Sequence, residues 1–205
     1  MSFFHDHSKK KKITILVAHP DPAPTMSSTM ALLYEESAKK AGHEVQRFHL
    51  GEMKFDPILH KGYKTIQELE PDLKRLQASI IWCDHFVLFY PNWWGTMPAL
   101  LKGLFDRMWL PGFAFNMRKT KQGTPALGWR KRLKGKTSRV FILSGTHPLM
   151  IWLLFGDYTN EIKMAILWFA GFRVRLSLFG PSETAPEWKR NEWRRKVAHL
   201  GEFAE

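Results

Sequence analysis

The feature that most constrains the fold is the regular alternation of short apolar runs with longer stretches whose apolar residues recur every three or four positions. The short runs are rich in β-branched and aromatic residues and have the length of buried strands, whereas the longer stretches have the period of helices. We predict strands over residues 13–18, 43–50, 85–90, 139–143 and 172–179. We predict helices over residues 27–41, 72–83, 97–109, 157–170 and 187–202.

Strands that alternate with helices specify a parallel sheet with helices on both faces. We therefore predict an α/β fold built on a doubly wound, five-stranded parallel sheet. A chain of 205 residues is long enough for one substantial core, so residues 13–205 are predicted to form a single domain. Residues 1–12 carry a run of lysines and are predicted to be a disordered basic tail.

Several classes of protein are excluded by simple features of the chain. The first twelve residues lack the apolar core of a secretory signal, and the most apolar region, Leu149–Phe172, is interrupted by charges that a membrane span would not carry. The single cysteine, Cys83, rules out an internal disulfide and a multi-cysteine metal site. We expect a cytoplasmic protein without a metal.

The net charge of +12 is concentrated in a few segments. Met117–Arg139 contains nine lysine or arginine residues and no acid, and it is predicted to be a basic loop. Such a segment can attract an anionic cofactor, RNA or a membrane surface, or it can be a solvated loop without a partner. We expect no nucleic-acid partner, because the basic segments show no recognition motif and no interleaved aromatic platform.

In a doubly wound sheet, ligands bind outside the carboxyl ends of the strands. This rule directs attention to three loops, 19–28, 91–97 and 144–148. The first has no Gly-x-Gly-x-x-Gly motif, but Thr25, Ser27 and Ser28 precede a helix, whose N-terminus can bind a phosphate together with His19. The alternative is that Thr25 or Ser27 simply caps the helix.

The second loop contains Asn92, Trp93, Trp94 and Gly95 directly after a predicted strand. A flat aromatic ligand could lie against its backbone and an indole, although a tryptophan here could instead pack under the loop or in a subunit interface. The third loop, Ser144-Gly145-Thr146, is small and rich in hydrogen-bond donors. His147 follows it and is either a catalytic acid or an ordinary loop residue.

The longest sequence signal is "PNWWGTMPALLKGLFDRMWLPGFAF", residues 91–115. It resembles the motif P-x-x-W-x-x-x-P-A-x-L-K-G-x-x-D-R, followed by G-F-A-[FY], of the flavodoxin-like NAD(P)H:quinone oxidoreductases, the family that includes DT-diaphorase. The resemblance extends from Lys12 over the rest of the chain. It implies a flavodoxin-like fold and a bound FMN or FAD.

The resemblance also implies roles for individual residues. His19, Thr25 and Ser28 would hold the phosphate region, and Gln77 would lie near the same group. Pro91, Asn92, Trp93 and Trp94 would run along the isoalloxazine ring, with Gly95 leaving space beside it. The pyrimidine edge would meet Ser144, Gly145 and Thr146, and Arg190 would match an arginine on the adenosine side.

The resemblance departs from the family at one point that matters for mechanism. Well-known members have a tyrosine and a histidine beside the flavin, whereas here Phe155 precedes Gly156-Asp157 and the region of the tyrosine reads "PLMIWLL". We therefore assign no catalytic residue. The family is usually dimeric, which would place the following residues in a shared substrate pocket: Phe113, Phe115, His147, Trp152 and Phe155.

Two functions follow as hypotheses. The first is an NAD(P)H:quinone oxidoreductase that uses FMN or FAD, acts by a ping-pong mechanism and reduces quinones or similar flat electrophiles. The alternative is a flavodoxin-like accessory subunit that regulates a membrane transporter and docks through Met117–Arg139.

Overall fold

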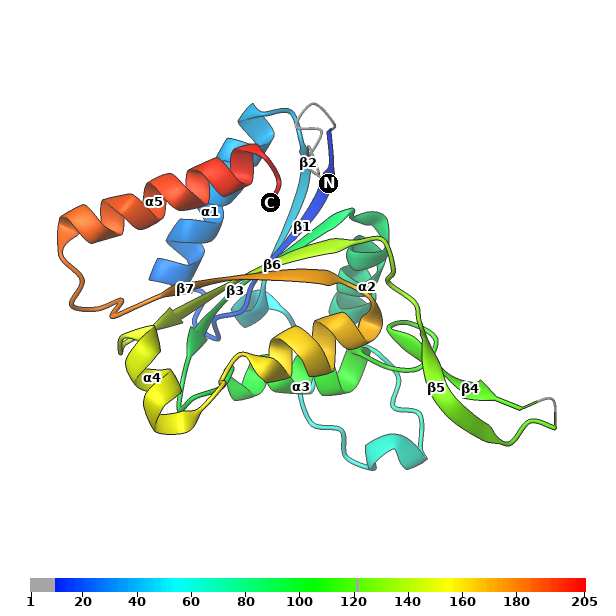
Figure 1. The fold of residues 1–205 in the computed structure, drawn as a ribbon. Helices are drawn as coiled ribbons and strands as arrows, with labels where there is room; N and C mark the ends of the chain where they lie inside the picture. Colours follow the sequence, from blue (N-terminus) through cyan, green and yellow to red (C-terminus); the bar gives the residue numbers. More distant parts are fainter. Residues whose placement is uncertain (1–9, 121) are drawn as a thin grey trace, which may run out of the picture.

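The centre of the computed structural model, which describes residues 10–120 and 122–205, is a five-stranded sheet in the order β2-β1-β3-β6-β7 (Figure 1). Every neighbouring pair of strands in it is parallel. The strands are β1 (Lys12–Val17), β2 (Glu44–His49), β3 (His85–Asn92), β6 (Thr137–Ser144) and β7 (Arg173–Phe179). The predicted doubly wound α/β fold is confirmed.

Helices cover both faces of the sheet, as predicted (Figure 1). The helices α1 (Met26–Lys40) and α5 (Glu187–Glu202) bury one apolar cluster, to which β1 contributes Ile13, Ile15 and Val17. The opposite cluster lies under α2 (Pro71–Trp82), α3 (Ala99–Met108) and the π-helix η3 (Glu161–Trp168). Because both faces are covered, the central strands are apolar at nearly every position.

Two predicted boundaries need correction: the end of the N-terminal tail and the start of the helix predicted from Asp157. Residues 1–9 of the predicted tail lie outside the described residues, but Lys12 at its end already opens β1. The helix predicted from Asp157 begins only at Asn160, and its central part is η3, where the wider π turn replaces the α turn.

The basic segment that we predicted as a loop is mostly an antiparallel hairpin of β4 (Phe115–Lys119) and β5 (Pro125–Lys131). It projects from the body of the molecule at the right of Figure 1. Aromatic contacts anchor its base: the Trp129 ring stacks on Phe169 at 4.3 Å, and the Lys131 ammonium lies 3.2 Å from the centre of the Trp168 ring. The abundance of lysine and arginine concealed this strand pattern.

A second element that we did not predict is the helix α4 (Pro148–Phe155). Its residues are all apolar, so the sequence shows no helical period. The imidazole Nδ1 of His147 accepts a hydrogen bond from the N–H of Leu149 at the first turn. The chain leaves the helix at Gly156.

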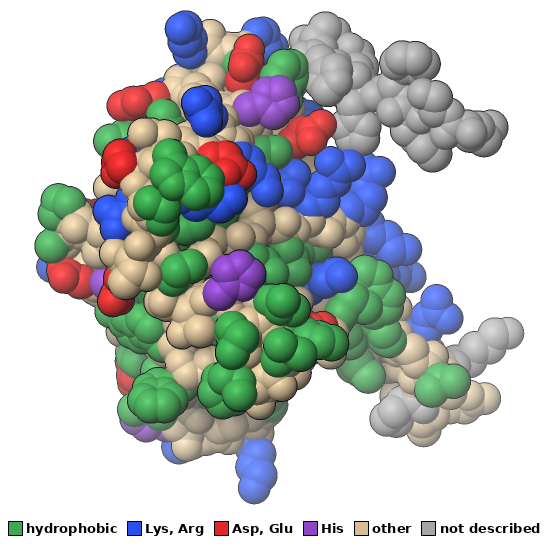
Figure 2. Space-filling view, turned by 60° about the vertical axis from the view of Figure 1, so that its left-hand side comes forward, with side chains coloured by type: hydrophobic (Ala, Val, Ile, Leu, Met, Phe, Trp, Pro, Cys, Tyr) green, Lys and Arg blue, Asp and Glu red, His purple; other side chains and the backbone are tan. Residues whose placement is uncertain are grey.

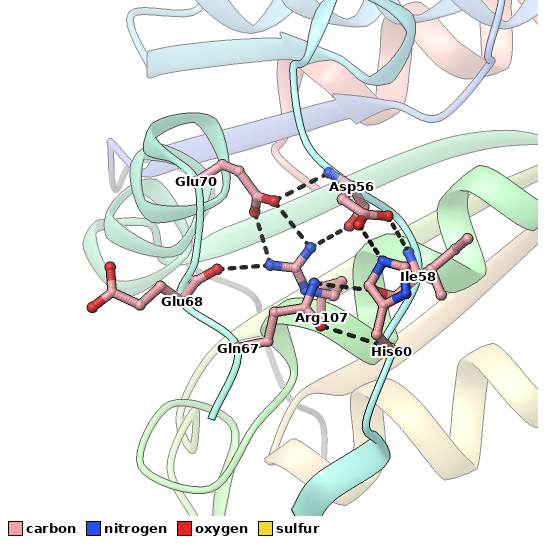
Figure 3. A network of polar contacts seen from close by, with 7 residues as sticks. All are labelled: Asp56, Ile58, His60, Gln67, Glu68, Glu70 and Arg107. Atoms are coloured by element: carbon pink, nitrogen blue, oxygen red, sulfur yellow. Dashed lines mark hydrogen bonds and ion pairs between the residues drawn. The ribbon is translucent and has the colours of Figure 1, made fainter. Parts of the chain in front are cut away.

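Arg107 of α3 ties down the long connection between β2 and α2, which contains the short 3-10 helices η1 (Leu50–Glu52) and η2 (Gly62–Lys64) (Figure 3). The Arg107 side chain is 0% exposed and donates to both carboxylate oxygens of Glu70, each at 3.0 Å. It also donates to the carbonyl oxygens of Asp56 and Glu68.

The Glu70 carboxylate completes this network. Partial burial raises the pKa of Glu70, but hydrogen bonds from Arg107 and from the Asp56 N–H outweigh burial and hold that pKa below its ordinary value. Glu70 is therefore charged at neutral pH and neutralises the guanidinium. A buried arginine is tolerated here because each of its two terminal nitrogens donates to the Glu70 carboxylate and to a backbone carbonyl.

We expect Arg107→Met to lower the free energy of unfolding by about 3 kcal/mol, because it leaves Glu70 and two carbonyl groups without their donor. Urea denaturation at neutral pH measures the change. The control is Arg75→Met, whose side chain is largely exposed and pairs with Asp72 at the surface. This control should change the free energy by less than about 0.5 kcal/mol. Equal effects of the two substitutions would contradict the role assigned to Arg107.

Candidate functional site

The loops after β1, β3 and β6 meet at the carboxyl edge of the sheet and enclose an open pocket of about 730 Å³. The pocket lies beside the ends of β1 and β3, where the strand order of the sheet reverses direction. Doubly wound proteins bind ligands at this position. A hollow of similar volume between β2 and α2, 700 Å³, contains no predicted site residue. Nine predicted residues line the pocket: His19, Thr25, Ser27, Pro91, Asn92, Trp93, Trp94, Gly145 and Thr146.

At the first loop, Thr25 is the N-cap of α1. Its hydroxyl accepts from the N–H of Ser28 at 3.2 Å, and the Ser28 hydroxyl accepts from the N–H of Thr25 at 2.8 Å. The N–H groups of Met26 and Ser27, both residues of the pocket wall, have no partner among the described residues. The capping alternative is thus confirmed for Thr25, and the free N–H groups and the positive end of a 15-residue helix remain for an anion.

The position of this loop is fixed by its neighbours. The carbonyl oxygen of Pro20 lies so close to Gly51 that an added Cβ atom would stand 2.1 Å from it, so only glycine fits. The His19 ring meets the Trp93 ring edge to face at 5.6 Å. The first and second loops are therefore in direct contact.

The second loop is a tight turn whose ends exchange hydrogen bonds. The Trp93 N–H donates to the Thr96 carbonyl at 2.9 Å, and the Thr96 N–H donates back at 3.1 Å. Trp94 and Gly95 occupy its centre with φ of 53° and 76°, the left-handed pair of a type I′ turn. Glycine adopts this backbone freely, whereas a bulky side chain is strained there.

Trp94, whose backbone is strained, is also 100% exposed, and Trp93 is exposed by nearly half. Trp93 is partly covered and contacts the His19 ring, whereas the Trp94 indole gains no burial that would offset its backbone strain. The turn is held in place from below, because the Thr96 hydroxyl donates to the Glu161 carboxylate of η3 at 2.8 Å. Two indoles are thus presented at the pocket by a fixed loop.

Asn92 provides the pocket with an unused acceptor. Its Oδ1 atom is buried and has no hydrogen-bond partner among the described residues. Buried polar groups are nearly always paired in native proteins, so this atom indicates a missing partner. The indoles, the Asn92 amide and the free N–H groups of α1 together fit a flat heteroaromatic ring that carries a phosphate, which is the chemistry of a flavin.

The third loop contributes Gly145 and Thr146 to the pocket, whereas Ser144 is buried behind them and its carbonyl accepts from the Ser182 N–H at 2.8 Å. Ser182 and Glu183 also line the pocket, and we did not predict them. They follow β7, so the rule about carboxyl ends would have identified them had it been applied to the fifth strand. The remaining wall residues that we missed are Met26 and Leu143.

Some predicted cofactor residues are not brought to this pocket. The Gln77 amide lies in the middle of α2 and donates to the carbonyl of Met108 at 2.8 Å, which ties α2 to α3. Arg190 stands behind the rim and donates to the carbonyl of Glu183 at 2.7 Å. Ser28 and Gly95 adjoin wall residues without lining the pocket themselves.

The five predicted substrate-pocket residues are dispersed in the single chain. Phe113 and Phe115 pack against Trp109 and Phe169. His147 caps α4, and Trp152 is exposed on the same helix. Phe155, also exposed, is the one that approaches the tryptophan turn: its Cβ would lie 3.9 Å from a Cβ added to Gly95.

No group of three His, Cys, Asp or Glu side chains gathers as a metal site in the described part of the chain. No helix within residues 10–120 or 122–205 is long and apolar enough to cross a bilayer.

We expect Trp94→Asn to raise the free energy of unfolding by about 1 kcal/mol, because asparagine tolerates the left-handed backbone and no packing is lost. Thermal and urea denaturation of the two proteins measure the change. The control is Trp188→Asn, which replaces an exposed tryptophan on the helix α5 and should not stabilise the protein. A destabilised Trp94→Asn protein would refute the strain that we assign to the turn.

Comparison with known proteins agrees with this geometry. A family described as having a flavodoxin-like fold matches residues 11–197. An uncharacterized NAD(P)H oxidoreductase of Haemophilus influenzae is 32% identical over 65% of this chain and 64% of its own length. The chain spans between 46% and 66% of the length of three curated relatives.

Two solved structures show the same fold. The NAD(P)H:quinone oxidoreductase from Methanothermobacter marburgensis has a TM-score of 0.77 and 22% identity, covering 96% of this chain and all of that one (100%). The FMN-dependent NADH-azoreductase from Bacillus anthracis, in complex with FMN, has a TM-score of 0.62 and 18% identity over 92% of this chain and 97% of that one. The chain therefore belongs to the flavodoxin-like family that includes the NAD(P)H:quinone oxidoreductases.

Proposed function

We propose that the protein is a flavin-dependent NAD(P)H:quinone oxidoreductase that transfers two electrons by a ping-pong mechanism. The observation that carries the proposal is the Trp93–Thr96 turn, a strained and exposed loop beside the N-terminus of α1. Strain of this kind persists where function needs it. The names of the relatives support the same activity, and the single, buried Cys83 suits a cytoplasmic site of action.

In this proposal the chain binds and orients the cofactor. The free N–H groups of Met26 and Ser27 would hold the phosphate of FMN or FAD, and the backbone of Pro91–Trp94 would run along the ring. Gly145 and Thr146 would face its polar edge, and Asn92 Oδ1 would accept one hydrogen bond. When bound, the flavin accepts a hydride from NAD(P)H and passes two electrons to a quinone.

Substrate positioning in this proposal depends on apolar surface more than on acid–base groups. The exposed indoles of Trp93 and Trp94 and the exposed side chain of Phe155 lie at the turn, where they would exclude water and hold a flat electrophile. No His or Tyr side chain is assigned to proton transfer. The acceptor is thus selected by shape and flatness.

We expect the purified or flavin-reconstituted protein to show visible flavin absorbance that bleaches with NADPH or NADH under nitrogen and returns on addition of a quinone. Asn92→Leu should weaken flavin binding by up to about tenfold, since it removes one buried acceptor. Fluorescence titration measures the affinity, and the mass of the released flavin separates FMN from FAD.

The matched control for this experiment is Asn191→Leu, an exposed position on α5, which should bind flavin as the parent protein does. Failure to bind either flavin after reconstitution would overturn the proposal. Bound flavin that neither NADPH nor NADH reduces would favour the alternative of a regulatory accessory subunit. That alternative draws its support from the β4–β5 hairpin, where Leu127 is 99% exposed within a basic arm.

The proposal includes a homodimer with shared sites, because α4 leaves a large apolar surface uncovered. Trp152, Leu153, Leu154 and Phe155 are each more than half exposed, beside the exposed tryptophan turn. Figure 2, which brings the α4 side of the molecule forward, shows hydrophobic side chains gathered on the lower half of that face. Contiguous apolar patches of this kind mark interfaces, and a second copy would cover α4 and close the pocket.

We expect the double substitution Leu153→Glu, Leu154→Glu to convert a dimer into a monomer, because it places charges in an apolar interface. Sedimentation velocity over a range of concentrations measures the mass. Leu127→Glu on the hairpin, a substitution of the same kind at another exposed leucine, should leave the dimer intact. A parent protein that sediments as a monomer at every concentration would exclude the shared site without excluding the reductase.

A further inference from the structure

A second chemically distinctive cluster lies at the opposite, amino edge of the sheet. The strand register places His85 of β3 beside Thr137 of β6, which in turn pairs with Arg173 of β7. Two residues further along, Arg139 of β6 pairs with Arg175 of β7. Because side chains alternate along a strand, these residues share the face that carries α1 and α5.

The cluster holds more positive than negative charge. Lys11, just ahead of β1, adds a fourth cation to Arg139, Arg173 and Arg175. The carboxylates that act on Lys11 are those of Glu205 and Asp84, and the Asp84 carboxylate also accepts a hydrogen bond from the Lys12 N–H at 3.0 Å. At the cavity itself three of these cations, Lys11, Arg173 and Arg175, stand beside one side-chain carboxylate, that of Glu205, and a doubly charged anion would balance the excess.

Two of the four cations bind the segment after α5, whereas Arg173 does not. Lys11 donates to the carbonyl of Ala204 at 2.9 Å, and Arg175 pairs with the Glu205 carboxylate at 3.1 Å, so both hold the segment after α5. The Arg173 side chain is exposed, and among the described residues the hydrogen bond that Arg173 donates is the one from its backbone N–H to the Lys136 carbonyl at 3.0 Å. A cation that holds nothing within the chain is available to a ligand.

Arg139 is the least explained of the four cations. Its side chain is 7% exposed, its closest polar contact is the Ser177 hydroxyl at 3.4 Å, and its Nε atom has no partner among the described residues. Burial and the neighbouring Arg175 lower the pKa of Arg139, and the Glu205 carboxylate offsets only part of that effect, so a further anion nearby would reduce the cost of the buried charge. His85 cannot supply negative charge, and burial, followed by Lys11 and Arg139, lowers its pKa to about 3.

A cavity of about 190 Å³ opens at this cluster, lined by Lys11, His85, Thr137, Arg173 and Arg175 and by one acid, Glu205, whose carboxylate Arg175 already neutralises. This is the volume of roughly six water molecules in the liquid. It can hold a tetrahedral oxyanion and part of its hydration shell, but it is too small for a nucleotide. Guanidinium groups present several N–H donors in a plane and bind phosphate oxygens in pairs.

We propose that this cavity is a binding site for a phosphate-sized dianion, held by Arg173, Arg175 and Lys11 with Arg139 beneath them. The ligand is either inorganic phosphate or the phosphate group of a small metabolite. The site lies across the sheet from the cofactor pocket and does not depend on the proposed reductase activity. Its occupancy would stabilise the amino edge of the sheet and the end of α5.

The test is isothermal titration calorimetry of the full chain with inorganic phosphate, at mildly alkaline pH and constant ionic strength set with chloride. We expect saturable binding that Arg173→Gln weakens by about tenfold, the loss of one charge-assisted contact. Arg118→Gln, the same change on the exposed hairpin strand β4, should bind phosphate as the parent does. Because Arg173 is exposed and unpaired, its replacement should leave the fold intact.

A second readout locates the ligand. Phosphate added at the same mildly alkaline pH should shift the NMR signals of the His85 ring protons in the parent and in Arg118→Gln but not in Arg173→Gln. Glycerol phosphate distinguishes the sources: tighter binding than phosphate indicates a metabolite, and weaker binding indicates the free anion. The absence of saturable binding, or equal weakening by Arg173→Gln and Arg118→Gln, would overturn the proposal.

Discussion

The parallel pairing of β1, β3 and β6 is the constraint on which the rest of the structure depends. Val17 pairs with Phe89, and Asn92 pairs with Ser144, so the three strands end at one edge in fixed register. Their following loops must then leave the sheet side by side. Because α1 follows the carboxyl end of β1 and returns the chain to the start of the parallel strand β2, its N-terminus points at the same edge. The pocket is a consequence of this topology before any side chain is considered.

Side chains then decide what the pocket can bind, and here the chain departs from what stability alone would select. A type I′ turn favours glycine and asparagine, yet Trp94 occupies its first central position. A surface helix favours polar residues, yet α4 has none. Both departures lie beside the same pocket, and conflicts between local preference and global fold are expected at functional sites. The Arg107 network and the Pro20–Gly51 contact hold the surrounding loops in place.

The sheet could be predicted well because buried parallel strands consist of uninterrupted runs of apolar residues. The sequence predicted α5 with its observed ends, since Pro186 precedes the helix and a polar amphipathic pattern fills it. It failed for α4, where an entirely apolar segment has no period, and for the β4–β5 hairpin, whose anchoring contacts come from η3. Such contacts join residues far apart in the chain, so no pattern in the sequence around the hairpin indicates them.

The candidate site was predicted to a similar extent and for similar reasons. Residues in the loops after three strands were found by topology, whereas Gln77 was carried over from the resemblance alone and lies in the middle of a helix instead. Ser182 and Glu183 were missed because the fifth strand ends at the same edge but its loop has no motif. Topology and resemblance thus point to the same three loops, and the assignment of individual residues to a cofactor stays a prediction.

The two edges of the sheet place opposite demands on an anion. At the carboxyl edge, the helix N-terminus of α1 offers free N–H groups and a positive dipole, so few charged side chains are needed to attract a phosphate. At the amino edge, the C-terminus of α5 presents carbonyl groups, and Ala204 already occupies Lys11. An anion there must overcome a negative dipole, which requires several cations on neighbouring strands. Lys11, Arg173 and Arg175, with Arg139 behind them, would supply such cations in the proposed site, where Glu205 neutralises only part of their charge.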